Sequence, residues 1–500
     1  MSSQRAKHKI ISLGRSFSLL LSMTGLLVST VPVRAQQPSE FQAEATALAG
    51  SILVGGKSMQ YLRELTDQFG GRLTGTPSYN RAAQWAAEQF RNMGVSDVKL
   101  ESFTLQNGWD RGWAKARIVS PLERPIHLES LGWAPSTRHG GVHAQIVRTS
   151  DIEPEKIRAQ SADIKGRVVM LDLSVLFAHG LGSFGKFLDA LKIYGEVGAA
   201  AILVGDQERN NVLNAFGFTW GGALSPLPMA QVGMEDAKLL ERLAERGPVT
   251  VEFSFENKTS GLIQVNNVLA EIKGREKPDD WVIVGAHLDS WDYGTGAQDN
   301  GSGCAMVLEA ARAISALVKS GKAPRRSIRF ALWGGEEEGL LGSGAYVKAH
   351  AQELNRCVAV LNTDNGAGHP SGWKVEGRKD IADALRPISK ALLVDLSGGE
   401  VSDRTSFDTD HGYFMLEGIP SLDLLVDTKP YGEVHHKTSD TIDKVDQHNL
   451  SLGSAIVAVT TWVVAERSEV LGPHIDHAAV GEILKKNNLD EFLKSLGAWK

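Results

Sequence analysis

A regular alternation of β-like and helix-like segments between residues 263 and 468 is the feature that most constrains the fold. Short apolar runs at 280–287, 327–333 and 357–362 are separated by longer segments in which apolar residues recur every three or four positions. This alternation predicts an α/β fold, with helices covering both faces of a central sheet. Ligands of such sheets bind beyond the carboxyl ends of the strands.

Side chains that bind metals follow the ends of those same three runs. In chain order they are His287, Asp299, the consecutive Glu336, Glu337 and Glu338, and Asp364, and segment 434–440 adds His435 and His436. Zinc takes imidazole nitrogen and carboxylate oxygen, and two ions about 3.5–4 Å apart can share one carboxylate. Any one of these residues alone is typical of a solvated charge or a structural histidine. Their joint occurrence at strand ends predicts a hydrolytic metal centre.

The first 35 residues have the pattern of a secretory signal peptide. Basic residues precede an apolar run at 17–31, and Val33-Arg34-Ala35 fits a cleavage site after Ala35. This predicts a secreted or periplasmic protein that is free of the membrane after cleavage; the alternative is an uncleaved anchor. The full chain has a net charge of −6, and its first 35 residues carry five basic and no acidic side chains. The acidic mature chain argues against nucleic acid and anionic membranes as partners.

We expect four further regions: a helical part at 36–110, a small α/β module at 111–262, the sheet domain at 263–470 and a tail at 471–500. Residues 40–103 are predicted to be helical, with helices at 59–69 and 79–94. The tail is predicted to form a solvated helix docked on the body. Cys304 and Cys357 fall in apolar segments. That favours free buried thiols and leaves a pair open in an exported protein.

The ordered motifs HxD, D, EE, D and H resemble the M28 family of di-zinc peptidases. The stretch 287–303 is most similar to the family's carboxypeptidase Q (plasma glutamate carboxypeptidase) branch, whose members are dipeptidases. Segments in the family's order are GRLTGT (71–76), NNVLAEIKG (266–274), GEEEGLLGS (335–343), GIP (418–420) and HKTSDT (436–441). The resemblance implies an α/β zinc exopeptidase fold, with a mixed central sheet flanked by helices. The 111–262 module resembles the protease-associated (PA) domain that is often inserted in this family.

The resemblance also implies how two zinc ions would be held. His287 and Asp364 would bind one ion, Glu337 and His436 would bind the other, and Asp299 would bridge them. These assignments follow the family's EExGLxGS and HxxxD patterns, which select Glu337 over Glu338 and His436 over His435.

The same resemblance implies the catalytic roles. Glu336 would be the general base that takes a proton from a metal-bridging water and passes it to the leaving amine. Asp289 would orient the imidazole of His287, and His435 would support the site or face the substrate. Tyr413 and Tyr431 are candidates for assisting the oxyanion. The pair Asp410-His411 resembles another family motif near the site, with no role assigned.

The predicted function is therefore the hydrolysis of short peptides, dipeptides in particular, by an exported di-zinc exopeptidase. Aminopeptidase, carboxypeptidase and dipeptidase specificity are all left open, and so is a homodimer. Two alternatives share the predicted fold. One is a single-zinc acyl transferase resembling glutaminyl cyclases, and the other is a non-catalytic peptidase-like binding module.

Overall fold

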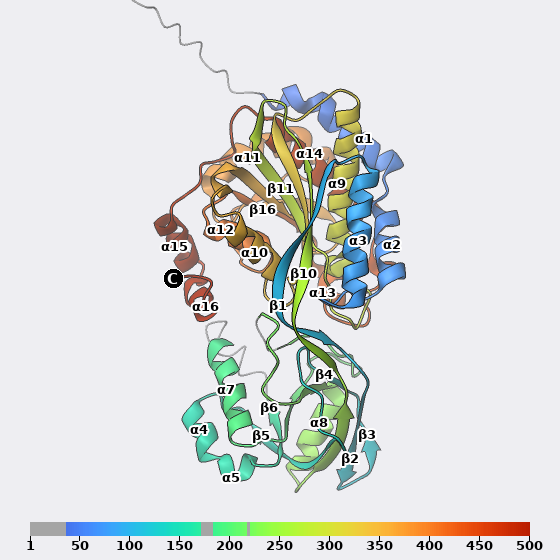
Figure 1. Cartoon of the computed structure of the whole chain (residues 1–500), viewed down its shortest axis with the longest axis vertical. Coiled ribbons are helices and arrows are strands. Elements are labelled where there is room, and N and C mark those ends of the chain that lie inside the picture. Colours follow the sequence, from blue (N-terminus) through green and yellow to red (C-terminus); the bar gives the residue numbers. More distant parts are fainter. Residues whose placement is uncertain (1–36, 172–183, 218–220) are drawn as a thin grey trace, which may run out of the picture. The chain divides into compact units, whose positions relative to one another are not determined.

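A mixed eight-stranded sheet positions the predicted site (Figure 1). The computed structural model describes residues 37–171, 184–217 and 221–500, so the predicted signal peptide at 1–35 lies outside the described residues. Across the sheet the strands run β1 (Asp97–Asp110), β10 (Lys258–Ile272), β12 (Arg326–Trp333), β11 (Lys277–His287), β13 (Cys357–Asn362), β16 (Ser421–Val426), β14 (Pro370–Lys374) and β15 (Glu400–Ser402).

The middle of this sheet is parallel, which brings the carboxyl ends of its strands to one edge. Strand β11 pairs in parallel with β12 and β13, and β13 pairs in parallel with β16. In the register, His287 lies opposite Trp333, and Gly285 lies opposite Asn362. The outer pairs β1–β10, β10–β12 and β14–β16 are antiparallel. The prediction of an α/β fold with a mixed sheet is confirmed.

Helices cover both faces of the sheet because side chains alternate along the central strands. On β11, Val282 and Val284 belong to one apolar core, while Trp281 and Ile283 belong to another on the opposite face. The first core is built with α1 (Gln42–Gly55), α2 (Ser58–Phe69), α3 (Pro77–Asn92), α9 (Ser302–Lys319), α11 (Lys379–Leu392) and α14 (Gln447–Glu466). The second is built with α10 (Leu341–Ala349) and α12 (His411–Leu416).

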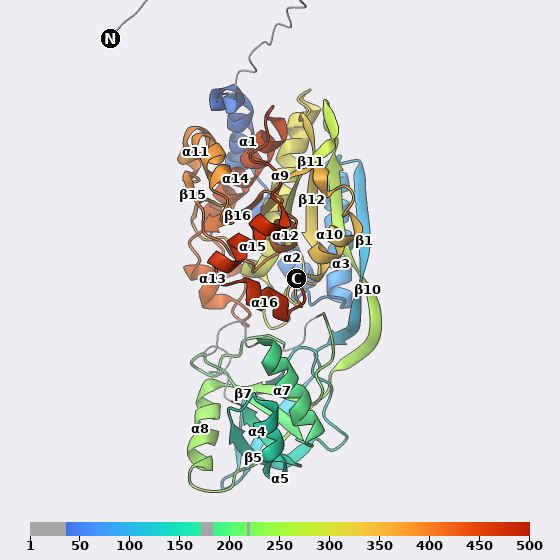
Figure 2. The ribbon, with the colours of Figure 1, turned by 90° about the vertical axis from the view of Figure 1, so that its left-hand side faces the viewer.

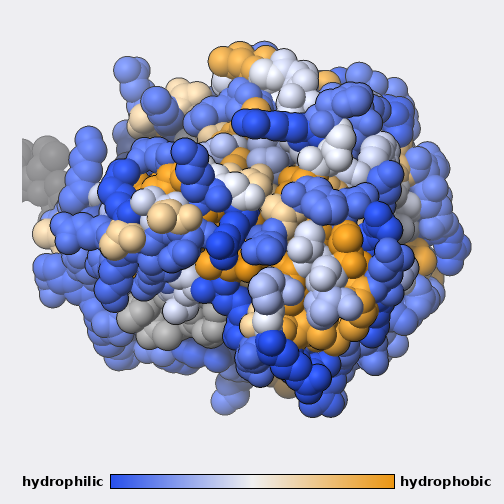
Figure 3. Space-filling model, turned by 90° about the horizontal axis from the view of Figure 1, so that it is seen from below, coloured by the Kyte–Doolittle hydropathy of each residue, from blue (hydrophilic) through white to orange (hydrophobic). Residues whose placement is uncertain are grey.

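A second module, residues 114–255, is inserted between β1 and β10 and has its own sheet and core. Its strands run β3 (Arg124–Pro125), β2 (Ala114–Ser120), β9 (Thr250–Phe255), β5 (Val142–Thr149), β6 (Val168–Leu171), β7 (Ala201–Gly205), β8 (Met229–Val232) and β4 (Leu128–Ser130). Its helices are α4 (Pro154–Ala159), α5 (Ser161–Ile164), α7 (Phe184–Glu196) and α8 (Met234–Ala244). A view from the end where this module lies shows a largely hydrophilic surface around an apolar area (Figure 3). The likeness to a PA domain stays a prediction.

Two local predictions were wrong. Residues 97–103 are not helical, because β1 begins at Asp97 and pairs with β10, more than 150 residues away in sequence. The tail forms two short helices, α15 (His477–Lys486) and α16 (Asp490–Ser495), rather than one (Figure 2). The prediction of free buried thiols at Cys304 and Cys357 is confirmed.

Candidate metal centre

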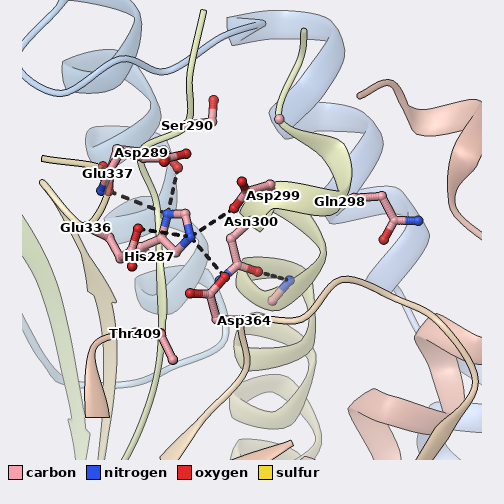
Figure 4. A network of polar contacts seen from close by, with 12 residues as sticks. His287, Asp289, Ser290, Gln298, Asp299, Asn300, Glu336, Glu337, Asp364 and Thr409 are labelled. Carbon is pink, nitrogen blue, oxygen red and sulfur yellow. Dashed lines mark hydrogen bonds and ion pairs between the residues drawn. The ribbon is translucent and has the colours of Figure 1, made fainter. Parts of the chain in front are cut away.

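Four connections bring the predicted ligands together at the carboxyl edge of the sheet, and Figure 4 shows those around His287. His287 is the last residue of β11, and Asp364 lies two residues beyond β13. The three glutamates lie in the turn after β12. Asp299 lies in the irregular turn Ala297–Gly301 before α9, and the Asp299–Asn300 peptide is cis. His436 follows α13 (Lys429–Val434).

The two carboxylate oxygens of Asp299 face two different histidines. Oδ1 of Asp299 lies 3.2 Å from Nε2 of His287, and Oδ2 lies 3.3 Å from Nε2 of His436. Nε2 of His287 also lies 3.0 Å from Oδ1 of Asp364, while Nε2 of His436 lies 3.0 Å from Oε2 of Glu337. The five side chains thus form two groups of donors that share one carboxylate. The family resemblance implied these same pairs, and their binding of zinc stays a prediction.

His435 lies beside the second group. Its Nε2 is 3.5 Å from Oδ2 of Asp299, and its ring stacks on that of His436 with centroids 3.7 Å apart. The side chain of His435 is 41% exposed, whereas that of His436 is 22% exposed. Burial and the neighbouring His436 lower the pKa of His435 to about 4. The neutral ring of His435 therefore lies on the solvent side of the donor set.

Burial disfavours the charged carboxylates of this site. It raises the pKa of Glu337 to about 7 and that of Asp364 to about 6, and the charge of Asp299 adds to both effects. Burial alone would lower the pKa of His436, but Glu337 and Asp299 raise it to about 10. These carboxylates therefore favour a nearby positive charge. Oε1 of Glu337 is buried and has no hydrogen-bond partner among the described residues. Oxygen and imidazole donors so arranged fit zinc.

Two residues that were not predicted to have a role hold the Asp299 turn. The fully buried Arg72 donates to the carbonyl oxygens of Leu288, Thr295 and Gly296 at 2.7–2.9 Å. Asp440 accepts from the backbone N–H of Asp299 at 3.1 Å and from that of the preceding residue at 2.7 Å. Both lie within quoted family motifs, GRLTGT and HKTSDT. The motifs identified the two segments as parts of the site, but they did not indicate what Arg72 and Asp440 contact.

Asp289 contacts His287 mainly through its backbone. Nδ1 of His287 lies 3.0 Å from the carbonyl oxygen of Asp289 and 3.7 Å from its carboxylate Oδ1. The other carboxylate oxygen accepts from the hydroxyl of Thr74 at 3.0 Å and from the N–H of Glu337 at 3.2 Å. Asp289 therefore links the loops of two candidate ligands, while its carbonyl oxygen orients the imidazole.

The residues predicted to act as base or to assist the oxyanion lie at different places relative to the donor set. Oε2 of Glu336 lies 3.9 Å from Nε2 of His287, at the edge of the donor set. The ring of Tyr431 lies 4.8 Å from that of His435, and burial together with the charges of Asp299 and Asp364 raises its pKa well above the usual value. Its hydroxyl therefore stays protonated. Tyr413 instead packs on Phe407.

The pair Asp410-His411 lies behind the site. Both residues are buried, and Nε2 of His411 lies 3.2 Å from Oε1 of Glu376. Burial raises the pKa of Asp410 to about 7. Neither side chain belongs to the two donor groups around Asp299.

Comparisons with known proteins agree with this geometry. Residues 267–461 match peptidase family M28. Carboxypeptidase Q of Bos taurus is 27% identical over 425 residues, covering 83% of this chain and 86% of the bovine protein. A peptidase M28 precursor from Shewanella amazonensis has a TM-score of 0.76 and 27% identity, over 88% of this chain and 100% of the other. A zinc aminopeptidase from Bacillus subtilis, 21% identical with a TM-score of 0.64 over 84% and 97% of the two chains, shares the fold.

Proposed function

We propose that this chain is a metallopeptidase of family M28, and that it is an exported exopeptidase that holds two zinc ions and hydrolyses short peptides. One observation carries the proposal: the two oxygens of Asp299 face separate groups of donors, His287 with Asp364 and Glu337 with His436. A carboxylate in that position bridges two ions in cocatalytic sites. These residues would hold the two zinc ions, which would supply Lewis acidity to polarise the scissile carbonyl and acidify an attacking water.

Glu336 is the residue placed to move the proton. It lies beside the donor set without belonging to either group, and its side chain is 12% exposed. Burial raises the pKa of Glu336 well above its usual value; the charge of His287 partly offsets this, and Asp364 adds to it. A carboxylate of raised pKa accepts a proton from the attacking water at Oε and then donates it to the leaving amine. The protonated hydroxyl of Tyr431 is the candidate donor to the oxyanion.

The substrate class follows from the relatives that cover most of the chain. Carboxypeptidase Q is similar over 83% of this chain, and the stretch 287–303 carries that branch's pattern. We therefore propose that unblocked dipeptides are the preferred substrates, and that His435, the most exposed of the three histidines at the site, contacts them. The signal-like pattern of residues 1–35 supports export.

The first experiment is hydrolysis of a matched panel: unblocked dipeptides, amino-blocked dipeptides and aminoacyl-anilides with the same side chains, each with and without added zinc. Zinc-dependent cleavage of the unblocked dipeptides is expected. Turnover of the anilides instead would make the protein an aminopeptidase of the same family. Cyclisation of N-terminal glutamine with one zinc per chain, or no cleavage of any substrate, would refute the proposal in favour of an acyl transferase or a binding module.

A further inference from the structure

A loop of the second module reaches the metal centre. This loop, residues 206–217, begins directly after β7 and ends beside the His436 segment. The backbone N–H of Ala215 donates to the carbonyl oxygen of His436 at 2.7 Å. The neighbouring residues Asn214 and Lys437 form an isolated antiparallel bridge. Backbone from the inserted module is thus paired directly with the peptide of a candidate zinc ligand.

That peptide has a backbone conformation that needs support. His436 has a φ of 61°, in the left-handed region that costs free energy for any residue with a side chain. The surrounding structure must stabilise this conformation for the ring to stay beside Asp299 and Glu337. The hydrogen bond from Ala215 acts on the carbonyl of His436 itself, so it is the most direct of the contacts that do this.

Asp206 fixes the loop that makes this contact. It is 6% exposed, and its two carboxylate oxygens accept from the backbone N–H of Asn214 at 2.7 Å, from the side-chain amide of Asn214 at 2.9 Å and from the N–H of Glu208 at 2.9 Å. One side chain therefore ties the start of the loop to the residue just before Ala215. An ion pair adds to this, because Nζ of Lys437 lies 2.9 Å from Oε1 of Glu208.

We infer that Asp206 is a positioning residue for the metal centre: through the 206–217 loop it holds His436 in its ligating conformation and so sets the affinity of one of the two zinc positions. The inference rests on the proposed function, since it requires that His436 binds zinc. Asp206 lies in a different module from the residues of the donor set. Loss of its carboxylate should therefore affect the His436 position and spare the position of His287 and Asp364.

The test compares Asp206→Ala and the milder Asn214→Ala with the parent chain. Zinc content is measured by mass spectrometry after dialysis against graded chelator, and zinc affinity by calorimetry. We expect one zinc equivalent to bind about 10-fold more weakly in Asp206→Ala, with a smaller effect in Asn214→Ala, and the other equivalent to be unchanged. The matched control is Arg117→Ala, which removes an exposed ion pair with Glu252 elsewhere in the same module. It should leave both affinities as they are.

A second comparison identifies the affected position. His436→Ala should remove the same equivalent, and adding Asp206→Ala to it should not weaken the remaining one. The inference is overturned if Asp206→Ala lowers the melting temperature but leaves both affinities unchanged, or if it weakens both equally. A parent chain that binds fewer than two zinc ions would instead refute the proposed function, and the inference with it.

Discussion

Replacing Lys374 with methionine should strongly destabilise the fold. Lys374 ends β14, its side chain is 11% exposed, and its Nζ lies 3.2 Å from Oδ2 of Asp423 and 3.4 Å from Oε1 of Glu376. Both carboxylates are about 1% exposed. Burial alone would lower the pKa of Lys374, but Asp423 and Glu376 raise it above its usual value, so the ammonium group is charged. The substitution leaves the buried carboxylate of Asp423 without its cation, and leaves Glu376 with His411 alone.

The magnitude follows from that burial. Removing one partner of a buried ion pair costs about 3–5 kcal/mol. A unit of this size unfolds with an entropy of roughly 1 kcal/mol/K, so the melting temperature should fall by about 3–5 °C. The damage should extend toward the site, because Asp423 also accepts from the side-chain amides of Asn362 and Asn365, which flank Asp364.

Denaturant unfolding of Lys374→Met, Asp423→Asn and the double variant measures this interaction. If the pair is coupled, the double variant should be less destabilised than the sum of the two single variants, by at least about 1 kcal/mol. Lys379→Met, which removes an exposed partner of Asp383, is the matched control and should change stability little. Strict additivity, or a Lys374→Met protein as stable as the control, would refute the reasoning.

Three further outcomes are expected. Glu336→Gln should abolish peptide hydrolysis while zinc content stays at the parent level; substantial residual turnover would remove Glu336 as the base. Burial alone would lower the pKa of His411, but Glu376 raises it from 6.5 to about 9. The charged His411 therefore stabilises the folded state fully below about pH 6.5, and this stabilisation is lost as the pH rises to about 9. The free energy of unfolding should fall by roughly 3 kcal/mol over this pH range, and unfolding measured against pH should show the fall in the parent but not in Glu376→Gln. Burial raises the pKa of Cys304 to about 12 and also raises that of Cys357, so thiol reagents at pH 8 should label neither until the chain unfolds; rapid labelling of the folded protein would contradict this.

The central strands could be predicted because they are buried on both faces. The run that became β11 is apolar at nearly every position, since Val282 and Ile283 face different cores. The edge strands gave weaker patterns. β15 has three residues and none is fully buried, and the first half of β1 mixes exposed and half-buried side chains. Their pairing with distant strands decides their conformation, and no local pattern records it.

The candidate site, too, could be predicted only in part. Its donors could be found because each follows a recognisable strand or motif. The groups that hold them could not, since those contacts join segments far apart in sequence. Arg72 reaches the carbonyl oxygens of Leu288 and Gly296, more than 200 residues away. The 206–217 loop likewise comes from an inserted module, and its contact with His436 forms only when the chain folds, so no local sequence pattern predicts it.

Several residues that disfavour stable folding lie at this edge of the sheet. His436 and Leu340 have positive φ values, and Asp299 and Glu337 are carboxylates buried almost completely. Each of these features costs free energy in a chain that is only marginally stable. They persist because the apolar sheet beneath them, Arg72 and the second module hold them in place. Strained backbone and buried charges that the surrounding structure supports are typical of functional sites. The geometry that destabilises the fold locally is therefore the strongest structural argument for the metal centre.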